Sequence, residues 1–485
     1  MAALDPRRGR GMGAERAARE SVGPGYANPP SATHSRRRRD QRAHPPSVNE
    51  PRRPRSLAEG GLEGISFRGL ELAAQIALLV LTARLMEPDG RGLYALASLA
   101  VLFVSLPLGS VWTANAIELS RRSMTSGDIL GASLAIAVVG GTGTAAVALA
   151  ASPLLGDRWW ILAIPAAVAP FILLARYEEG LYQALGDVRA VNWMVLGRVL
   201  LGIAFIAPPL VLGASDGLAI AVWGLSLVVL AAAGLPRLRR QVGTMRVPRQ
   251  RAVYGRMVRV SLKLAAGNGA MLITPRVALV ALAIFATTAE VGVYSVAIAI
   301  AEMLYMAVYA LDLTAFPRIS MSNPQDSATL TRHASRHAGL LALAGAAVVV
   351  PASMLLLDSV VGAGYADVPL LLVILIPGVV AQSIGKILFA FFAVRQARPG
   401  LITKAAILTA LVNVPATFAL VPVLGVWGAA AAASVAGILG NAFLTRRFLR
   451  DTGSKPRALL PGPGELRDYL GLAHTLTARA RRGAI

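Results

Sequence analysis

The chain contains no cysteine, and both histidine and lysine are scarce. Without cysteine it can form no disulfide, no thiolate metal site and no thiol nucleophile. His333 and His337 have the i, i+4 spacing of a helical metal site, but Asp326 alone lies near them to complete a ligand set. We therefore expect a solvated face there, and we expect no metal or other cofactor. The other histidines, all outside the long apolar runs, are His34, His44 and His474.

Motifs that mark common enzymes are also missing. The chain has no dinucleotide fingerprint, no HExxH and no GxSxG motif. Gly378–Lys386 is bounded by glycine like a phosphate-binding loop, but its spacing is too long and Ile387 stands where serine or threonine is required. The sequence thus indicates no enzyme. A membrane saccharide polymerase or ligase would need an extended outer loop, and the predicted outer loops are short.

Apolar residues dominate what is present. They make up 55% of the chain, charged residues make up 15%, and the mean hydropathy is +0.59. A soluble protein of this length could not bury so much apolar surface around one core. A membrane-spanning helix needs roughly 20 mostly apolar residues. Runs of that length recur, without the alternating pattern of a membrane barrel, so we predict an all-α polytopic membrane protein.

We predict about twelve spans. They lie near residues 65–85, 92–117, 128–150, 158–176, 191–212, 217–236, 258–285, 291–316, 336–357, 367–391, 401–422 and 425–447.

The net charge of +22 is carried almost wholly by arginine, and its distribution predicts the topology. The predicted loops on one side, with their helix ends, hold sixteen arginines, whereas those on the other side hold only Arg84, Arg91 and Arg158. Cytoplasmic loops of membrane proteins collect Arg and Lys. We therefore predict a plasma-membrane protein with both termini in the cytoplasm. Because the membrane topology accounts for the net positive charge, we do not attribute that charge to nucleic-acid binding, and we expect no nucleic-acid partner.

Five segments are expected along the chain. Residues 1–58 are too polar to fold, and a solvated cytoplasmic tail, or a true start at Met12 or later, is favoured over a tether to anionic inner-leaflet lipid. The other segments are a six-helix lobe (59–236), a basic cytoplasmic linker (237–257), a second six-helix lobe (258–447) and a cytoplasmic tail (448–485). In that tail, residues 465–482 have a weakly amphipathic helical pattern, and we expect a helix that either lies on the inner leaflet or is cytosolic.

The two predicted lobes look alike. Gly92–Ala97 (GLYALA) opens the second span of the first lobe, and Gly292–Ala297 (GVYSVA) opens the second span of the second lobe. Each follows a short acidic turn. Because six spans per lobe make both lobes enter the membrane in the same direction, we predict a parallel repeat about an axis along the membrane normal.

These repeats resemble polysaccharide exporters of the multidrug/oligosaccharidyl-lipid/polysaccharide flippase superfamily. The likeness spans roughly residues 60–450, through motifs that are weak singly but specific in order and spacing. They are ARL at Ala83–Leu85 followed by Gly92–Ala97, EVGVYSVA at Glu290–Ala297, FPRIS at Phe316–Ser320, GYAD at Gly364–Asp367 leading to PLLL at Pro369–Leu372, and GVWGAA at Gly425–Ala430. The arginine-rich N-terminus is not part of the family pattern.

The resemblance implies a two-lobed flippase with a central cavity that faces the two sides of the membrane in turn. Its substrate would be an undecaprenyl-diphosphate-linked oligosaccharide for lipopolysaccharide or exopolysaccharide synthesis. Its partners would be the polysaccharide polymerase and glycosyltransferases of the same pathway. Lipid II flippases of the superfamily usually have more spans than this chain, which favours the polysaccharide branch. A lipid II flippase and a cation-coupled multidrug exporter are the alternatives within transport.

Charged residues inside the predicted spans indicate the site, because lipid exposure of such a charge is costly. We predict a cationic set that binds substrate and an acidic set that couples an ion. The substrate-binding set is Arg68, Arg198, Lys263, Arg276, Lys386 and Lys404. The ion-coupling set is Glu302, Asp312 and Glu71. Arg68, Lys263 and Lys404 lie close enough to the cytosolic ends that snorkelling explains them equally well.

The excess of cations in these sets bears on the substrate. Arginine can grip diphosphate oxygens with two donors at once, whereas a cationic cavity repels the organic cations that drug exporters commonly carry. The sequence therefore favours a lipid-linked diphosphate over a drug. A non-transporting scaffold that recruits partners through its basic tails is a further alternative, and deletion of residues 1–58 and 451–485 would distinguish it.

Overall fold

The structure is a computed structural model that describes residues 57–121, 124–462 and 465. The regular structure in these ranges is entirely helical. Within them, nine helices are long and apolar enough to cross a membrane. The predicted tail 1–58, apart from Leu57 and Ala58, and the predicted tail helix 465–482, apart from Glu465, lie outside the described residues.

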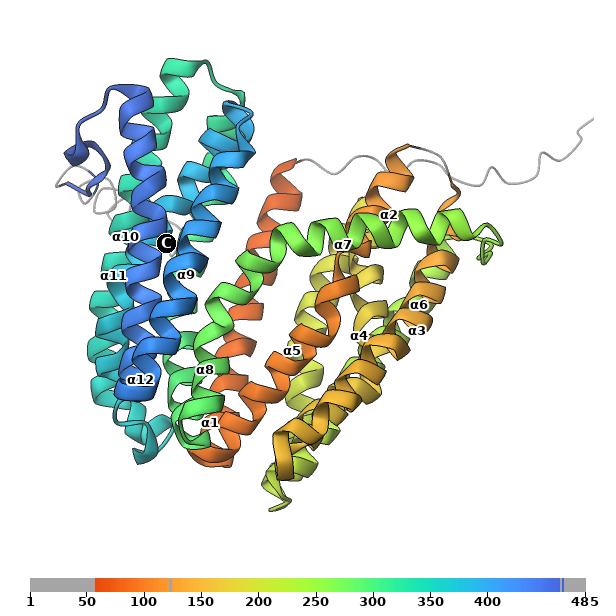
Figure 1. Cartoon of the computed structure of the whole chain (residues 1–485). Coiled ribbons are helices and arrows are strands. Elements are labelled where there is room, and N and C mark those ends of the chain that lie inside the picture. Colours follow the sequence, from red (N-terminus) through yellow and green to blue (C-terminus); the bar gives the residue numbers. More distant parts are fainter. Residues whose placement is uncertain (1–56, 122–123, 463–464, 466–485) are drawn as a thin grey trace, which may run out of the picture. The chain divides into compact units, whose positions relative to one another are not determined.

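The elements follow one another along the chain (Figure 1). They are α1 (Leu57–Gly109), α2 (Val111–Ser120), α3 (Ser126–Ala151), η1 (Ser152–Arg158), α4 (Trp160–Ala184), α5 (Val188–Val211), α6 (Asp216–Val242), α7 (Arg251–Ile273), η2 (Thr274–Arg276), α8 (Val277–Phe285), α9 (Thr288–Met321), α10 (Pro324–Val360), η3 (Ala363–Tyr365), α11 (Val368–Phe389), the π-helix η4 (Ala390–Arg395), α12 (Pro399–Thr452) and η5 (Pro456–Leu459). Of the predicted linker 237–257, residues 243–250 lie outside the helices.

Two of these helices are hairpins. α1 and α12 have 53 and 54 residues, and in each a residue with positive φ reverses the chain. In α1 it is Glu87 (φ 56°), followed by Pro88, and in α12 it is Gly425 (φ 54°). Figure 1 shows both chains returning beside themselves. Each hairpin supplies two antiparallel spans, so the nine long helices supply eleven, and η2 with α8 (Thr274–Phe285) is a shorter apolar helix beside them.

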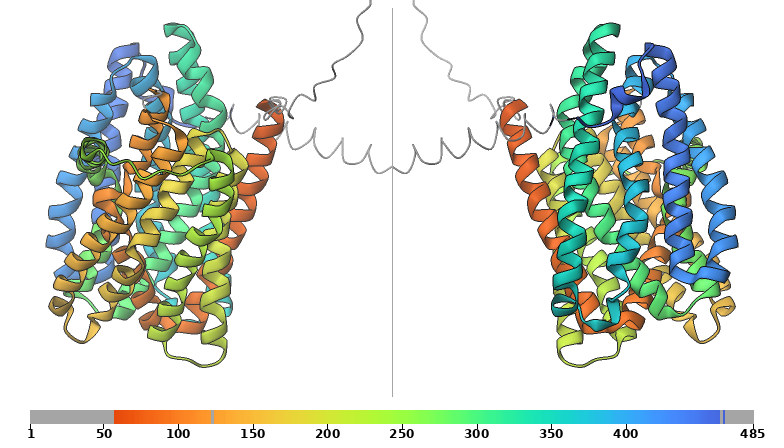
Figure 2. Two further views of the ribbon diagram at one scale, coloured as in Figure 1. Left: turned by 90° about the vertical axis from the view of Figure 1, so that its right-hand side faces the viewer. Right: turned by 90° about the vertical axis from the view of Figure 1, so that its left-hand side faces the viewer.

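The helices form two bundles, seen from both sides in Figure 2. We call α1–α6 the N-lobe and α8–α12 the C-lobe. Large buried side chains fill both, for example Tyr177, Tyr182 and Leu196 in the N-lobe and Phe392 and Phe448 in the C-lobe. On the outer flanks, apolar side chains such as Val139 (73% exposed) and Leu355 (78% exposed) face away from the protein. Such a surface is compatible with lipid and not with water.

The predicted span 258–285 is broken rather than continuous. Pro275 lies in η2, where the α-helix stops between α7 and α8. α7 runs crosswise over the N-lobe (Figure 1), and its Arg256 guanidinium binds the Glu118 carboxylate of α2 at 2.8 Å. Val253 and Met257 of α7 belong to the N-lobe core, whereas Ala281 and Leu282 of α8 belong to the C-lobe core. The chain therefore changes lobe at η2.

The lobes meet most extensively where α1 packs against α9. A Cβ atom at Gly92 would overlap the Thr288 carbonyl oxygen, and a Cβ at Gly292 would overlap the Pro88 carbonyl oxygen. We call this backbone contact the glycine crossing. It explains the predicted sequence repeat, because the same glycine of each lobe lies against the opposite lobe and only glycine leaves room for that approach.

Two further contacts fasten the lobes beside the glycine crossing. The Tyr365 hydroxyl donates to the Ala83 carbonyl at 3.1 Å, and Arg84 donates to the Ser359 carbonyl at 2.8 Å.

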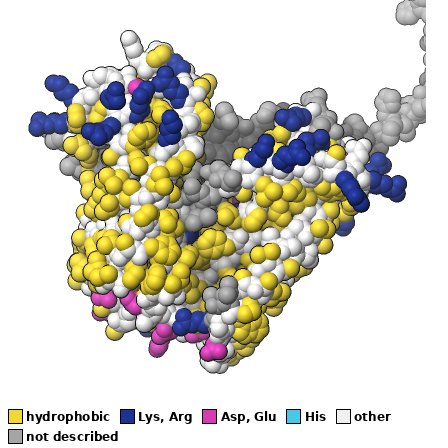
Figure 3. Space-filling view, in the orientation of Figure 1, with side chains coloured by type: hydrophobic (Ala, Val, Ile, Leu, Met, Phe, Trp, Pro, Cys, Tyr) yellow, Lys and Arg dark blue, Asp and Glu magenta, His cyan; other side chains and the backbone are white. Residues whose placement is uncertain are grey.

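Lys and Arg side chains gather at the opposite end of the molecule, where α7 lies, and Asp and Glu side chains gather at the end with the crossing (Figure 3). We call these the basic end and the acidic end. Figure 3 also shows that the surface is notched between the lobes at the basic end.

The chain after α12 lies on the C-lobe at the basic end. We call its described residues from Pro456 to Gly462, with Glu465, the C-terminal strap. Leu459 is 2% exposed, and Arg336 of α10 donates to the Ala458 carbonyl and to the Glu465 carboxylate. Burial alone raises the pKa of Glu465, but hydrogen bonds from the Gly462 amide and Arg336 outweigh it and hold this pKa below its usual value. Ionised Glu465 therefore helps to keep the strap in place.

The glycine crossing generates the first prediction. Gly92→Ala or Gly292→Ala adds one methyl group to a contact without space for it, at a cost of about 1–3 kcal/mol. We expect each variant to shift the population toward lobes separated at the acidic end. The measurement is the distance between spin labels on Asp89→Cys and Asp367→Cys, which react alone because the chain has no native cysteine. Gly143→Ala is the control, since nothing lies within 4 Å of its added Cβ. Unchanged distances in both variants would contradict the prediction.

The strap generates the second prediction. Because the folded-state pKa of Glu465 is depressed, its stabilisation is present above the unfolded-state pKa and is lost as the pH falls through the folded-state pKa, which lies below the usual value of a glutamate. A spin label on the exposed Arg457→Cys should therefore become mobile in acid, and in Glu465→Gln it should be mobile at every pH. Equal mobility at neutral pH with and without this substitution would show that the carboxylate does not hold the strap.

Candidate functional site

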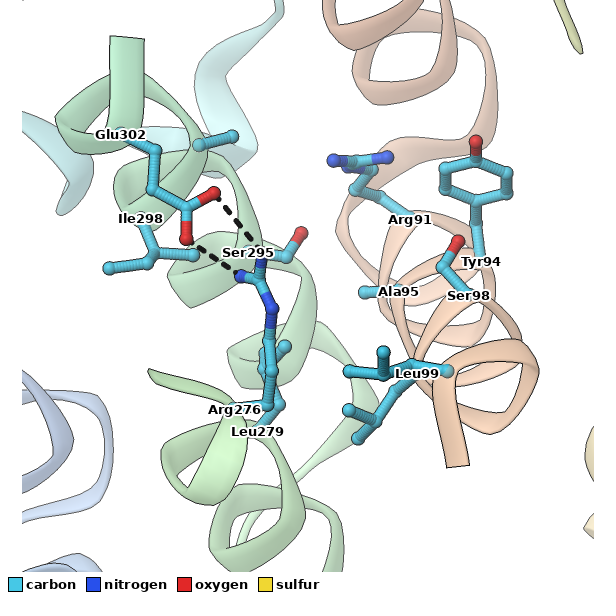
Figure 4. Close-up of a pocket in the computed structure, with 12 residues that line it drawn as sticks. Arg91, Tyr94, Ala95, Ser98, Leu99, Arg276, Leu279, Ser295, Ile298 and Glu302 are labelled. Carbon is cyan, nitrogen blue, oxygen red and sulfur yellow. Dashed lines mark hydrogen bonds and ion pairs between the residues drawn. The ribbon is translucent and has the colours of Figure 1, made fainter. Parts of the chain in front are cut away.

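A cavity of about 350 Å³ lies between the lobes. The second half of α1 forms one wall, and η2, α8 and α9 form the other. Figure 4 shows Arg91, Tyr94 and Ser98 on the N-lobe wall and Arg276 and Glu302 on the C-lobe wall. We call it the central cavity. It combines guanidinium, hydroxyl and carboxylate groups in a molecule whose other buried surfaces are mainly apolar.

Arg276 and Glu302 form a two-point ion pair (Figure 4). One guanidinium nitrogen of Arg276 is 2.9 Å from Glu302 Oε1 and the other is 3.2 Å from Oε2. Arg276 stands at the break in the seventh span, directly after Pro275, which has no backbone N–H to donate. Both side chains remain partly exposed, at 33% for Arg276 and 44% for Glu302. The sequence predicted both residues for the site, and the structure brings them together.

Arg91 is the principal residue that the sequence interpretation missed. It was assigned to an outer loop, but it lies on the second half of α1, because the chain reverses at Glu87 and Pro88 and helix resumes at once. Arg91 is 8% exposed, donates to the Thr82 hydroxyl at 3.1 Å and lies 5.1 Å from the Tyr94 ring centroid. Its Nε has no hydrogen-bond partner among the described residues. The available signal was the i, i+3, i+7 spacing of Arg91, Tyr94 and Ser98.

Two further cavities adjoin the central one. One of about 390 Å³ shares Arg91, Tyr94 and Glu302 with it and adds Gln75 of α1. The other, of about 530 Å³, shares Glu302 and lies within the C-lobe. Its polar lining comprises Tyr305, Gln382, Lys386, Thr409, Asn413 and Asn441, and the remainder is largely apolar. Tyr305 donates to Gln382 at 2.6 Å, and Asn413 donates to the Thr274 carbonyl at the helix break at 2.7 Å.

Four predicted site residues meet around Tyr309 of α9. The Arg68 guanidinium carbon lies 5.9 Å from the Tyr309 ring centroid and the Lys386 ammonium lies 5.1 Å from it. Each cation is also paired with an acid: Arg68 with Glu71 at 2.6 Å, and Lys386 with Asp312 at 3.6 Å. Arg68 and Glu71 belong to the N-lobe, whereas Lys386, Asp312 and Tyr309 belong to the C-lobe. We call this contact the Tyr309 clasp.

Three predicted substrate-binding residues lie apart from these cavities. Arg198 of α5 pairs with Glu179 of α4 at 2.6 Å, inside the N-lobe. Lys263 of α7 and Lys404 of α12 are exposed. None of the three lines the central cavity or the two cavities that adjoin it.

The N-lobe holds one more polar residue that the sequence interpretation passed over. Glu178 of α4 is fully buried, and neither of its carboxylate oxygens has a hydrogen-bond partner among the described residues. The predicted fourth span ended at residue 176, so Glu178 was assigned to a cytoplasmic loop. α4 instead continues to Ala184, two helical turns further.

No protein-family profile and no curated protein matches this chain. Solved structures do match. A structure of lipid II flippase MurJ in an inward closed conformation aligns with a TM-score of 0.64 at 13% identity, over 83% of this chain and 89% of that one. An inward-facing multidrug resistance MATE family transporter of the MOP superfamily aligns with a TM-score of 0.57 at 18% identity, over 80% of this chain and 96% of that one.

These likenesses concern the fold. Both structures share its arrangement of transmembrane helices in two lobes, and the predicted fold class, about twelve membrane helices in two six-helix lobes, is confirmed. The structures matched are transporters, and the polysaccharide branch is not singled out among them. This chain thus has the fold of MurJ and of MATE transporters.

Proposed function

We propose that this protein flips an undecaprenyl-diphosphate-linked oligosaccharide across the plasma membrane by alternating access. One observation carries the proposal: Arg91 of the N-lobe and Arg276 of the C-lobe line one cavity from opposite sides. Two guanidinium groups that face a common space suit the oxygens of a diphosphate. Because the two groups belong to different lobes, a bound anion would be held by both lobes at once.

The charge balance of the site also favours an anion. Around the central cavity and the Tyr309 clasp, four cations (Arg68, Arg91, Arg276 and Lys386) stand against three carboxylates (Glu71, Glu302 and Asp312). Each carboxylate already has a cationic partner, whereas Arg91 has a hydroxyl and an aromatic ring. An organic cation would therefore find no carboxylate in this set without a cation beside it.

The ion pairs suggest how an ion could be coupled to transport. A diphosphate that takes Arg276 displaces Glu302, and the freed carboxylate can then take up a proton or a sodium ion. Asp312 and Lys386 can exchange in the same way. The three predicted ion-coupling acids would thus act as exchangeable partners of three of the predicted substrate-binding cations, Arg68, Arg276 and Lys386.

The glycine crossing at the acidic end and the notch at the basic end support a state that opens toward the basic end, past the Tyr309 clasp. We assign the basic end to the cytoplasm, since arginine collects there. The lipid tail would remain in the bilayer beside α1 and α9. An inside-negative potential would favour outward movement of the anionic head by about 2.3 kcal/mol per charge per 100 mV.

Two alternatives have the same fold behind them: a lipid II flippase and a multidrug exporter. A lipid II flippase would use the same cations, because its substrate is also a lipid-linked diphosphate. A multidrug exporter would require an acidic site, and the paired carboxylates disfavour it. We propose no catalytic activity.

The third prediction concerns the cations. In liposomes with a fluorescent undecaprenyl-diphosphate oligosaccharide in one leaflet, Arg91→Ala, Arg276→Ala and Lys386→Ala should each slow its appearance in the other leaflet. Loss of a hydrogen bond to a charged group costs about 1.5–3 kcal/mol, so the rate should fall roughly 10- to 100-fold. Arg239→Ala, an exposed cation on α6, is the matched control. Full activity of both Arg276→Ala and Lys386→Ala would refute the site, and transport of ethidium in place of the lipid would favour the drug exporter.

The fourth prediction concerns Glu302. Glu302→Gln keeps the shape of the side chain but removes its charge, so Arg276 loses its competing anion. We expect undecaprenyl diphosphate to bind roughly fivefold more tightly, in keeping with an exposed ion pair worth about 1 kcal/mol. We also expect flipping to lose its response to a proton or sodium gradient. Both are measured on the same reconstituted protein, with Glu290→Gln as control because Glu290 only caps α9 at the acidic end. A retained gradient response would exclude Glu302 from ion coupling.

A further inference from the structure

A fourth cavity, of about 450 Å³, lies in the C-lobe at the basic end. Three segments that are far apart in sequence form it: the first turns of α10, the π-helix η4 with the residues after it, and the last turn of α12. Its lining is Pro324, Gln325, Ala328, Thr329, Arg332, Phe391, Arg395, Gln396, Asp451 and Thr452. It shares no residue with the central cavity, so nothing inferred for it depends on the proposed function.

The backbone beside this cavity is irregular. Residues Ala390–Arg395 form a π-helix, and Ala397 has φ 51°, in the left-handed region that alanine rarely adopts. Conformations of that kind cost about 1–3 kcal/mol and cluster at ligand sites. The irregular segment supplies Phe391, Arg395 and Gln396 to the cavity wall.

The charges of the lining favour an anion. Arg332 and Arg395 are the lining cations, and Arg332 donates to Thr329 at 2.9 Å. The Nε of Arg395 is buried and has no hydrogen-bond partner among the described residues. A buried donor left without an acceptor is costly.

One carboxylate, Asp451, belongs to the lining, but it does not neutralise these arginines. Arg447 lies 3.0 Å from Asp451 and Arg398 lies 3.5 Å from it, so its charge is already balanced. Asp326, in the first turn of α10, does not line the cavity and accepts a hydrogen bond from Asn323 instead. The partial positive charge at the start of the long helix α10 adds to the attraction.

We propose that this cavity binds a phosphate-bearing anion, supplied either by the headgroup of an anionic phospholipid or by phosphate in solution. Two arginines suit phosphate oxygens, the polar side chains of Gln325, Thr329, Gln396 and Thr452 suit the hydroxyls of a glycerol headgroup, and Phe391 gives one apolar wall. The bound group would contact α10, η4 and α12 at once, and so add to the packing that already joins these three segments.

The experiment uses the purified full chain in detergent, and its readout is the thermal unfolding midpoint followed by tryptophan fluorescence. The probes are dihexanoyl phosphatidylglycerol, dihexanoyl phosphatidylcholine and inorganic phosphate. We expect a saturable rise in the midpoint with an anionic probe and none with phosphatidylcholine, since a ligand that binds the folded state stabilises it. A rise with phosphatidylglycerol alone identifies a lipid headgroup, and an equal rise with inorganic phosphate identifies a soluble ligand.

Variants locate the binding. Arg332→Gln with Arg395→Gln should weaken the apparent affinity at least about tenfold, and Arg395→Lys should also weaken it because lysine lacks the planar fork. Arg239→Gln with Arg240→Gln removes the same charge from an exposed part of α6 and should change the affinity by less than roughly twofold. If the double variant does not fold, Arg395→Lys decides the matter. No rise with either anionic probe, or equal losses in the control pair and the cavity variants, would overturn the proposal.

Discussion

The close backbone contact at the glycine crossing is the constraint on which the rest of the arrangement depends. Gly92 and Gly292 let the chain of one lobe lie directly on a carbonyl group of the other. No side chain separates the lobes there, and the hydrogen bonds of Tyr365 and Arg84 lie beside the contact. The lobes are thus held at the acidic end by a close backbone contact that lies within the more extensive packing of α1 against α9. The central cavity begins immediately beside it: Arg91 is the residue before Gly92, and Tyr94 and Ser295 follow Gly92 and Gly292 by less than one turn of helix.

The ion pairs around the cavity are the second determinant. A cation or a carboxylate alone would be costly at this depth, and pairing lowers that cost. The pairs Arg276–Glu302 and Lys386–Asp312 are only partly buried, so they can exchange partners. The same interaction therefore stabilises the empty site and leaves it ready for an anion. Arg91 differs, because its contacts among the described residues are a hydroxyl and a ring rather than a carboxylate.

The spans and the two-lobed repeat could be predicted from the sequence because the hydrophobic effect acts on local runs of residues. Arg276, Glu302 and Lys386 could be predicted because a charged side chain inside an apolar run must face protein or water rather than lipid. What could not be predicted depends on chain direction and on distant partners. Arg91 was misplaced because its hairpin turns inside a continuous helical stretch. Arg198 proved to pair within its own lobe, with a glutamate on a neighbouring helix. The position of α7 on the N-lobe, and not on the C-lobe that follows it in sequence, involves an ion pair with Glu118, which is far away in sequence.

The break at η2 has a mechanical consequence. α7 is anchored to the N-lobe by the Arg256–Glu118 pair, and α8 is embedded in the C-lobe, so the three residues Thr274–Arg276 are the joint through which one body turns against the other. Arg276 is part of that joint. A rotation of one lobe against the other would change the backbone torsion angles of this segment and so the direction of the Arg276 side chain. A ligand that held the guanidinium in place would oppose that rotation. If Arg276 binds the substrate as proposed, the residue that holds the ligand also belongs to the joint between the lobes.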